Sequence, residues 1–177
     1  MYKLATIISR IFDPFVMFVV LFIILFYRSP KLPWVLFLMV VIPFMIFFIA
    51  WKTKIISDWD VRDRKERPKI LWSMFGVEIV AMIVLQLWQL MPIILAFIGF
   101  AVITHFWKIS GHLSTVAFVT GLIIVRFGVS WWPVLLAVPL VGWARVVRKN
   151  HSIAQVIAGT LYSWIVLLIT YYVSHIS

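Results

Sequence analysis

The chain has 177 residues, of which 64% are hydrophobic and only 12% are charged. A soluble domain of this length could not bury so much apolar surface, so lipid is expected to be the solvent for most of the chain. The net charge of +10 does not point to nucleic acid, because the basic residues do not follow a soluble face. Anionic lipid headgroups or a phosphorylated substrate are better partners for it. The absence of cysteine excludes disulfides and cysteine-ligated metal.

The apolar runs predict six or seven membrane-spanning helices. Residues 1–12 include Lys3 and Arg10 and are expected to lie along the membrane interface as an amphipathic start, not as a cleavable signal. Asp13-Pro14 has the form of an N-cap followed by a first helical residue, so the first span should run from there to about Tyr27. The later spans are predicted at residues 33–51 with a kink at Pro43, and at 70–90, 92–107, 113–129, 132–146 and 153–173.

The predicted fold class is therefore all-α, with residues 1–177 forming a single polytopic bundle of transmembrane helices in the cell membrane. No repeat, linker or low-complexity segment divides the chain. Several spans are short, since a helix over residues 92–107 would extend only about 24 Å, against about 30 Å of hydrocarbon core. Either the helices continue into the polar strings between them, or some segments are tilted or half-buried.

Three polar strings interrupt the apolar runs, at residues 62–68, 107–112 and 143–151. Two predicted spans separate the first string from the second, and two more separate the second from the third. Each pair of spans crosses the membrane and returns, so all three strings are expected on one face, here called the motif face. They would bring His112, His151 and several cations together there, which suits chemistry on a phosphate.

Phosphoryl transfer needs a nucleophile, a proton donor for the leaving oxygen and fixed positive charge around the phosphoryl oxygens. The sequence has no Walker loop, no glycine-rich dinucleotide turn and no pair of histidines at metal-binding spacing, so neither metal nor cofactor is expected. The residues left for this chemistry are His112, His151, Arg67, Arg145 and the Ser110-Gly111 backbone. Gly111 lets the main chain approach an anion, and a helix beginning near His112 would direct its first N–H groups toward it.

These strings resemble the pattern of the type 2 phosphatidic acid phosphatases. That family has a Lys followed seven residues later by Arg-Pro, then Pro-Ser-Gly-His, then Ser-Arg, five residues, His, three residues and Asp. Here Arg67-Pro68 matches the end of the first part and Ser110-Gly111-His112 matches the second. Arg145 and His151 have the spacing of the third part. The resemblance covers residues 58–159, which is most of the chain.

The resemblance implies a metal-independent membrane lipid phosphatase that hydrolyses a phosphomonoester or pyrophosphate of a lipid through a phosphohistidine. Phosphatidate, phosphatidylglycerophosphate and polyprenyl diphosphate fit equally well as the phosphorylated lipid. His151 would be the nucleophile, and His112 would protonate the leaving group and then activate water. The groups implied to hold the phosphoryl oxygens are Arg67, Arg145, Ser110 and the Gly111 N–H.

The chain departs from the family pattern in each of its three parts. Ile109 and Ala144 replace the usual Pro and Ser. Asp60 stands where the family has its first Lys, so Arg64 or Lys65 would have to supply that phosphate contact.

Gln155 stands where the family has the Asp behind the nucleophile. A Gln carbonyl accepts a hydrogen bond from an imidazole N–H and fixes its tautomer, but it does not offset the charge of an imidazolium. Together with Asp60, this departure keeps open the alternative of a catalytically silent relative that binds phospholipid or scaffolds membrane proteins. A small transporter is a weaker alternative, because the chain lacks paired inverted halves.

Other polar residues have plainer interpretations. Asp58, Asp60 and Asp63 are expected to make surface ion pairs rather than to bind a divalent metal, and His105 and His175 are expected to be interfacial. Ionisable groups within apolar runs are functional candidates by default, and two such groups are present, Glu78 and Arg126.

The distribution of cations predicts an orientation. Of the sixteen Lys and Arg residues, all but Arg28, Lys31 and Arg126 fall on the motif face or in the N-terminal segment. The positive-inside rule would then place the motif face on the cytoplasmic side.

Overall fold

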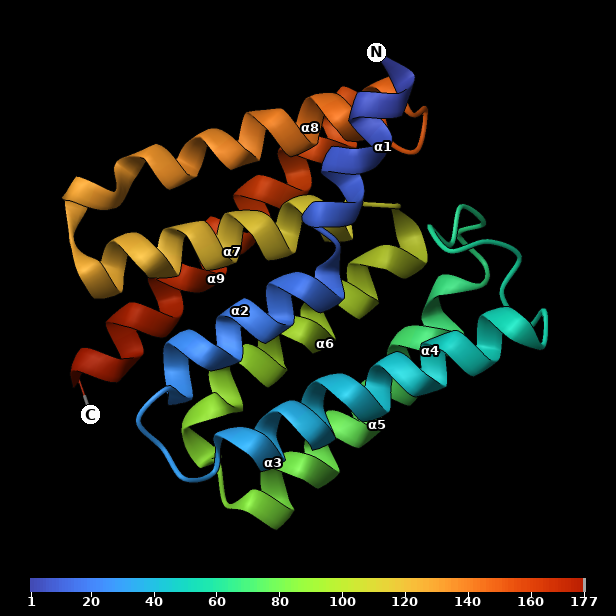
Figure 1. Ribbon diagram of the computed structural model, residues 1–177. Coiled ribbons are helices and arrows are strands. Elements are labelled where there is room, and N and C mark those ends of the chain that lie inside the picture. Colours follow the sequence, from blue (N-terminus) through green and yellow to red (C-terminus); the bar gives the residue numbers. More distant parts are fainter. Residues whose placement is uncertain (177) are drawn as a thin grey trace. The chain divides into compact units, whose positions relative to one another are not determined.

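The computed structural model describes residues 1–176, and the side chains of residues 1–172, so His175 lies outside the described side chains. Every regular element within the described residues is a helix (Figure 1). Six helical stretches are long and apolar enough to cross a membrane, and a seventh, Gly111–Phe127, is apolar but shorter. The predicted fold class, an all-α polytopic transmembrane bundle with six or seven spans, is confirmed.

The chain divides into two compact units. Unit 1 comprises Met1–Ile24 and Ile109–Ser177, and unit 2 comprises Leu25–Lys108. The prediction of a single domain over residues 1–177 concerns how these units join, and it stays a prediction.

Unit 2 begins with one long helical stretch built from α3 (Leu32–Leu36), the π-helical turn η1 (Phe37–Val41) and α4 (Ile42–Lys52). Pro43 accounts for the π-helical turn, because proline lacks an N–H and its ring crowds the carbonyl one turn earlier. A π-helical turn immediately before Pro43 has wider hydrogen-bond spacing than an α-helix, and this spacing accommodates both effects. The predicted disturbance at Pro43 therefore takes the form of a local π turn inside a continuous stretch.

The rest of unit 2 consists of α5 (Arg67–Leu85), the 3₁₀ turn η2 (Trp88–Leu90) and α6 (Met91–Phe106), with α5 packed against α4 and α6. The predicted bounds of the α5 span, residues 70–90, are wrong at both ends. The helix starts at Arg67, because Pro68 is well suited to a first turn, and it stops where Gln86 adopts φ 53°. This helix continues into the polar string before it, but with 19 residues it is slightly shorter than the 21-residue span that was predicted.

Unit 1 contains α1 (Tyr2–Ile11), all but the end of α2 (Pro14–Phe26), α7 (Gly111–Phe127), the 3₁₀ helix η3 (Val129–Leu136), α8 (Ala137–Val147) and α9 (Ile153–Ile176). Asp13 caps α2 as predicted, since its Oδ1 accepts the Phe15 N–H at 3.1 Å. The amphipathic α1 packs along α8. The predicted interfacial position of α1 stays a prediction.

The stretch formed by η3 and α8 is longer than the span predicted at residues 132–146. Its eight 3₁₀ residues rise more steeply than α-helical ones, so with the eleven residues of α8 the stretch extends about 32 Å. Sequence periodicity did not distinguish this 3₁₀ half from the α-helix expected over residues 132–146.

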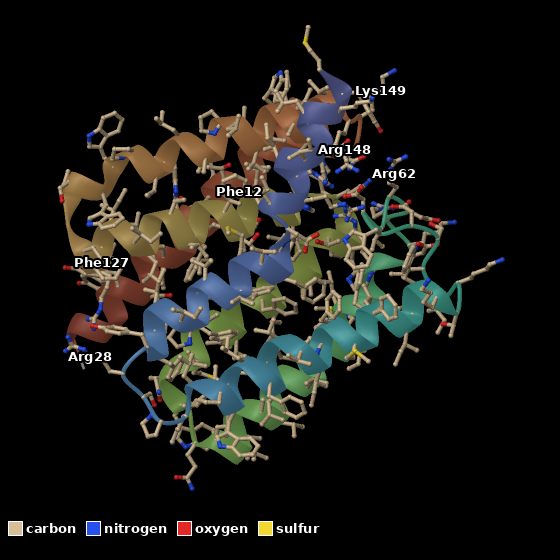
Figure 2. The ribbon with its side chains drawn as sticks, in the orientation of Figure 1. Phe12, Arg28, Arg62, Phe127, Arg148 and Lys149 are labelled. Carbon is tan, nitrogen blue, oxygen red and sulfur yellow. The ribbon has the colours of Figure 1, made fainter. Side chains whose placement is uncertain are left out.

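Three helices alternate in direction within unit 1 (Figure 1). Because α7 runs away, η3 and α8 return and α9 runs away again, the start of α7, the end of α8 and the start of α9 share one end, here called the motif end. Figure 2 shows Arg148 and Lys149 at this end, and Phe127 at the other end of α7. Two of the three polar strings therefore lie at one end, as predicted. The first string belongs to unit 2, so its meeting with them stays a prediction.

The C-terminus of α5 closes with Gln86 in the left-handed conformation that glycine adopts most easily. The Leu87 N–H donates to the Met82 carbonyl at 2.9 Å, and the Gln86 N–H donates to the Ile83 carbonyl at 3.1 Å, which together form a Schellman motif.

Replacing Gln86 with Gly should therefore stabilise the protein. A non-glycine residue in this conformation costs about 1 kcal/mol, partly offset by the greater freedom of glycine when unfolded, so we expect a gain of about 0.5 kcal/mol. The measurement is the thermal unfolding midpoint in detergent. Val84→Gly, at an exposed helical position, is the matched control and should lower the midpoint; a similar loss in Gln86→Gly would contradict the argument.

Candidate active site

The C-terminal turn of α8 carries two buried cations on one face. Arg145 is 1% exposed and Arg148 is 7% exposed, and their spacing of three residues places them one above the other on the helix. The helix ends in a second Schellman motif, with Lys149 at φ 55°. The Asn150 N–H donates to the Arg145 carbonyl at 3.1 Å, and the Lys149 N–H donates to the Val146 carbonyl at 2.9 Å. This turn leaves His151 just before the start of α9.

The start of α9 is a capping box formed by Ser152 and Gln155. The Gln155 N–H donates to Ser152 Oγ at 3.3 Å, and the Ser152 N–H donates to Gln155 Oε1 at 3.2 Å. This reciprocal pair satisfies backbone donors that have no carbonyl partner within the helix. Ser-x-x-Gln before an apolar run is a known helix-start signature, so Gln155 has a structural role besides any chemical one.

The same Gln155 oxygen also contacts the His151 ring, with 3.2 Å between Nδ1 and Oε1. The sequence predicted this contact from the spacing of four residues. Since Oε1 already accepts the Ser152 N–H, it acts as an acceptor, and Nδ1 of the neutral ring must carry the proton. The lone pair of the neutral ring then lies on Nε2, in a side chain only 6% exposed. This is the tautomer that a nucleophile attacking through Nε2 requires.

The start of α7 lies next to this pair. Ser110 caps α7, with its Oγ accepting the Leu113 N–H at 3.4 Å. The Ser110 N–H donates to the Gln155 backbone carbonyl at 3.2 Å, which holds the α7 start against the first turn of α9. His112, 8% exposed, sits two residues farther on, in the turn whose N–H groups point out of the helix end.

Arg145 is positioned by the packing of α8. A Cβ built on Gly142 would lie 3.0 Å from Val156 Cγ1 and 3.9 Å from Leu113 Cδ1, so this face of α8 looks toward both α7 and α9. Arg145 is one turn closer to the end of α8. Because α8 runs opposite to the other two helices, that turn faces the first residues of α7 and α9. Ser110, Gly111, His112, Arg145, His151 and Gln155 are thus brought to one end of unit 1.

The charge of unit 1 is strongly one-sided. Its sequence holds six Lys and Arg residues and a single acidic residue, Asp13. Asp13 lies 4.0 Å from Arg10 across the junction between α1 and α2. A buried cationic end of this kind favours an anionic ligand.

The first polar string belongs to unit 2 and is organised by its own loop. Arg67 is buried, and its Nε donates to the Val61 carbonyl at 2.9 Å. Val61 is a β-branched residue at φ 44°, a strained conformation that this hydrogen bond helps to hold. Arg64 donates through Nη1 to the Phe106 carbonyl, and the side chain of Lys65 is exposed. Their expected contacts with a phosphate stay predictions.

The expected ion pairs of Asp58 and Asp63 are wrong. Asp58 Oδ1 accepts the Asp60 N–H at 2.8 Å, and Asp63 Oδ1 accepts the Lys65 N–H at 2.8 Å, so both carboxylates cap backbone turns of the loop. Among the described residues, no three His, Asp or Glu side chains lie together as a metal site would require.

Sequence reasoning gave too little weight to Arg148 and did not single out Asn150, Ser152, Ser114 or Gly159. Arg148 and its neighbour Lys149 are alike in sequence as basic residues of one polar string, yet Arg148 is buried and Lys149 is exposed. The spacing of three residues from Arg145 was the available signal. Ser152 was detectable from the capping-box pattern, whereas the closeness of Gly159 to α7 needs the fold.

Comparison with models of known protein families, with curated proteins and with solved structures found no match for this chain. The family resemblance therefore rests on the motif residues quoted above.

The contact between His151 and Gln155 should be visible in the titration of the ring. We expect the neutral His151 ring to be protonated at Nδ1, as measured by ¹⁵N NMR of the imidazole. Gln155→Glu keeps the acceptor and adds a negative charge, so the pKa of His151 should rise and its titration midpoint should move to higher pH. Gln155→Leu should abolish the preference for one tautomer.

Ser152→Ala is the control, because it weakens the capping box at a cost of about 1 kcal/mol without removing Gln155. Its His151 ring should keep the parent tautomer. An unchanged tautomer in Gln155→Leu would show that residue 155 does not orient the ring.

Proposed function

We propose that this protein is an integral-membrane phosphatase that hydrolyses a phosphomonoester or pyrophosphate of a membrane lipid through a phosphohistidine formed on His151. The observation that carries the proposal is the 3.2 Å contact between His151 Nδ1 and Gln155 Oε1, which puts the proton of the neutral ring on Nδ1 and its lone pair on Nε2. The resemblance of the three polar strings to the type 2 phosphatidic acid phosphatases supports the same assignment.

In the first step, Nε2 of His151 attacks phosphorus in line with the bond to the leaving oxygen. The N–P bond forms while the P–O bond breaks, and protonated His112 gives its proton to the leaving alcohol or phosphate. His151 keeps its Nδ1 proton, donated to Gln155, and becomes a cationic phosphoimidazole.

In the second step, neutral His112 takes a proton from water, whose oxygen attacks phosphorus. The P–O bond forms and the N–P bond breaks, which returns the electron pair to Nε2 of His151 and releases inorganic phosphate. His112 ends protonated, as it began, so the cycle needs no metal and no further reactant.

Charge around the phosphoryl group comes from Arg145 and the first turn of α7. A guanidinium binds two phosphoryl oxygens in a fixed geometry, and the N–H groups at a helix start stabilise an anion without reorganising. Arg148, buried one turn from Arg145, adds positive charge to this end.

The neutral Gln155 is compatible with this chemistry because the phosphoryl oxygens themselves offset the cationic imidazole. The Gln155 amide oxygen still accepts a hydrogen bond from Nδ1, which is the part of a carboxylate's role that orients the ring. The lipid tail of the substrate would stay in the bilayer that the apolar helices occupy. Phosphatidate, phosphatidylglycerophosphate and polyprenyl diphosphate are the candidate substrates.

His151→Ala should abolish phosphate release from these lipids in detergent micelles, because no other group replaces the attacking nitrogen. His112→Ala should reduce turnover strongly with lipid substrates but much less with p-nitrophenyl phosphate, whose leaving group needs no protonation. All assays contain EDTA, under which the parent should stay active. His105→Ala, at an exposed position of α6 that the motif pattern does not include, is the control and should match the parent.

A His151→Ala variant with normal turnover would overturn the proposed mechanism. A folded parent that binds phosphatidate vesicles yet releases no phosphate would instead favour the silent lipid-binding relative, to which Gln155 and Asp60 point.

We further propose that the protein lies in the cell membrane with its motif end on the cytoplasmic side, on the positive-inside bias of its Lys and Arg residues. Because the chain has no cysteine, single Cys substitutions test this directly. Ser130→Cys, in η3 at the other end of unit 1, should react with a membrane-impermeant maleimide on intact cells. Ser57→Cys, in the loop before α5, should react only after lysis, and the reverse pattern would invert the orientation.

A further inference from the structure

We infer that Gly159 and Ser114 are positioning residues of this site, which set the distance between the α7 start and His151. The inference rests on the proposed function, because it concerns how the two histidines are held for the same reaction. Neither residue belongs to the motif positions that carry the phosphate chemistry.

Gly159 lies where α9 comes closest to α7. A Cβ at this position would stand 2.7 Å from the Ser110 backbone oxygen, 3.3 Å from the Ser110 backbone nitrogen and 3.2 Å from Ser114 Oγ. The nearest of these atoms belongs to the backbone, so it moves only if the start of α7 moves with it. Any side chain at residue 159 must therefore push Ser110 away from α9.

Two hydrogen bonds hold α7 at this short distance. Ser114 Oγ donates to the Gly159 carbonyl at 3.1 Å, and the Ser110 N–H donates to the Gln155 carbonyl at 3.2 Å. Both acceptors lie in the first turns of α9, next to the capping box that orients His151. Small residues at helix contacts permit this close approach. A hydroxyl that hydrogen-bonds across the contact also stabilises the helix pair in lipid.

The arrangement matters for chemistry because the two histidines come from different helices. His112 is two residues beyond Ser110, whereas His151 is tied to α9 through Gln155. A displacement of about 1 Å between groups that must act in line lowers turnover by about 100-fold. The contact at Gly159 thus lies between the two elements that carry the histidines.

The same helix pair offers a matched control at Gly121, toward the other end of α7. A Cβ at Gly121 would stand 2.5 Å from Leu167 Cδ2, which is the end of a flexible side chain. Gly121→Ala therefore crowds the α7 and α9 contact without any backbone atom in the way. Its effect on stability should resemble that of Gly159→Ala, while the histidines should stay in place.

The experiment compares parent, Gly159→Ala and Gly121→Ala in detergent. We expect Gly159→Ala to lower kcat by 10- to 100-fold with a smaller change in KM, and Gly121→Ala to keep kcat within about threefold of the parent. Hydrogen exchange of the segment 109–113 should be faster in Gly159→Ala only, because the Ser110 N–H loses its bond to Gln155. Adding Ser114→Ala to Gly159→Ala should not restore kcat, since the closest contact is with the Ser110 backbone.

Equal kcat values in the two alanine variants would overturn the inference, as would restoration of kcat in the double variant. A parent without phosphatase activity would overturn the proposed function instead, and the exchange of residues 109–113 would then still report whether Gly159 holds α7.

If Gly159→Ala does not fold, Ser114→Ala carries the test because it adds no atoms. We expect it to lower kcat by about threefold to tenfold, the scale of one neutral hydrogen bond. The control is Thr120→Ala, which removes a buried hydroxyl of α7 that bonds only within its own helix, to the Val116 and Ala117 carbonyls. Equal kcat values for these two variants would overturn the role of Ser114 and Gly159 in positioning.

Discussion

Helix ends must satisfy backbone groups that have lost their partners within the helix, and the motif end of unit 1 is built from three solutions to this requirement. α8 ends in a Schellman motif at Lys149, α9 starts with the Ser152 and Gln155 capping box, and α7 starts with Ser110. In an apolar chain these ends are where polar groups gather, so the same atoms that terminate the helices are available for chemistry. Gln155 Oε1 illustrates this, because it accepts both a capping N–H and the His151 ring.

Much of this end could be predicted from the sequence, because its signals are local. The cap at Asp13 and the contact between His151 and Gln155 depend on spacings of two and four residues, which fix geometry at any helix start. The alternation of α7, α8 and α9 follows from counting spans. The contact at Gly159 could not be predicted, since it depends on which face of α9 turns toward α7, and every face of these helices is apolar enough for lipid. The burial of Arg148 was missed for a related reason. Arg148 and Lys149 are adjacent basic residues, and the packing of α8 decides which of the two is buried.

The bounds of α5 and the 3₁₀ half of the η3 and α8 stretch escaped prediction for different reasons. Hydropathy locates apolar runs but does not see that Arg67-Pro68 is a favourable helix start, so the predicted span began too late. The Pro133 region remains apolar throughout, and apolarity does not distinguish a 3₁₀ from an α backbone. Only the second departure lengthens its stretch, because α5 has 19 residues against the 21 of the predicted span.

The neutral side chain of Gln155 fits the charge of its surroundings. A carboxylate behind a histidine raises the basicity of the ring and stabilises the imidazolium. This stabilisation matters most where the imidazolium has no other negative charge beside it. Here the substrate itself would bring two or more negative charges to an end of the protein that holds Arg145 and Arg148 in buried positions. The requirement that survives is geometric, namely an acceptor for the Nδ1 proton. A capping-box glutamine already provides that acceptor as a condition of starting α9, so helix formation and orientation of His151 depend on one oxygen atom.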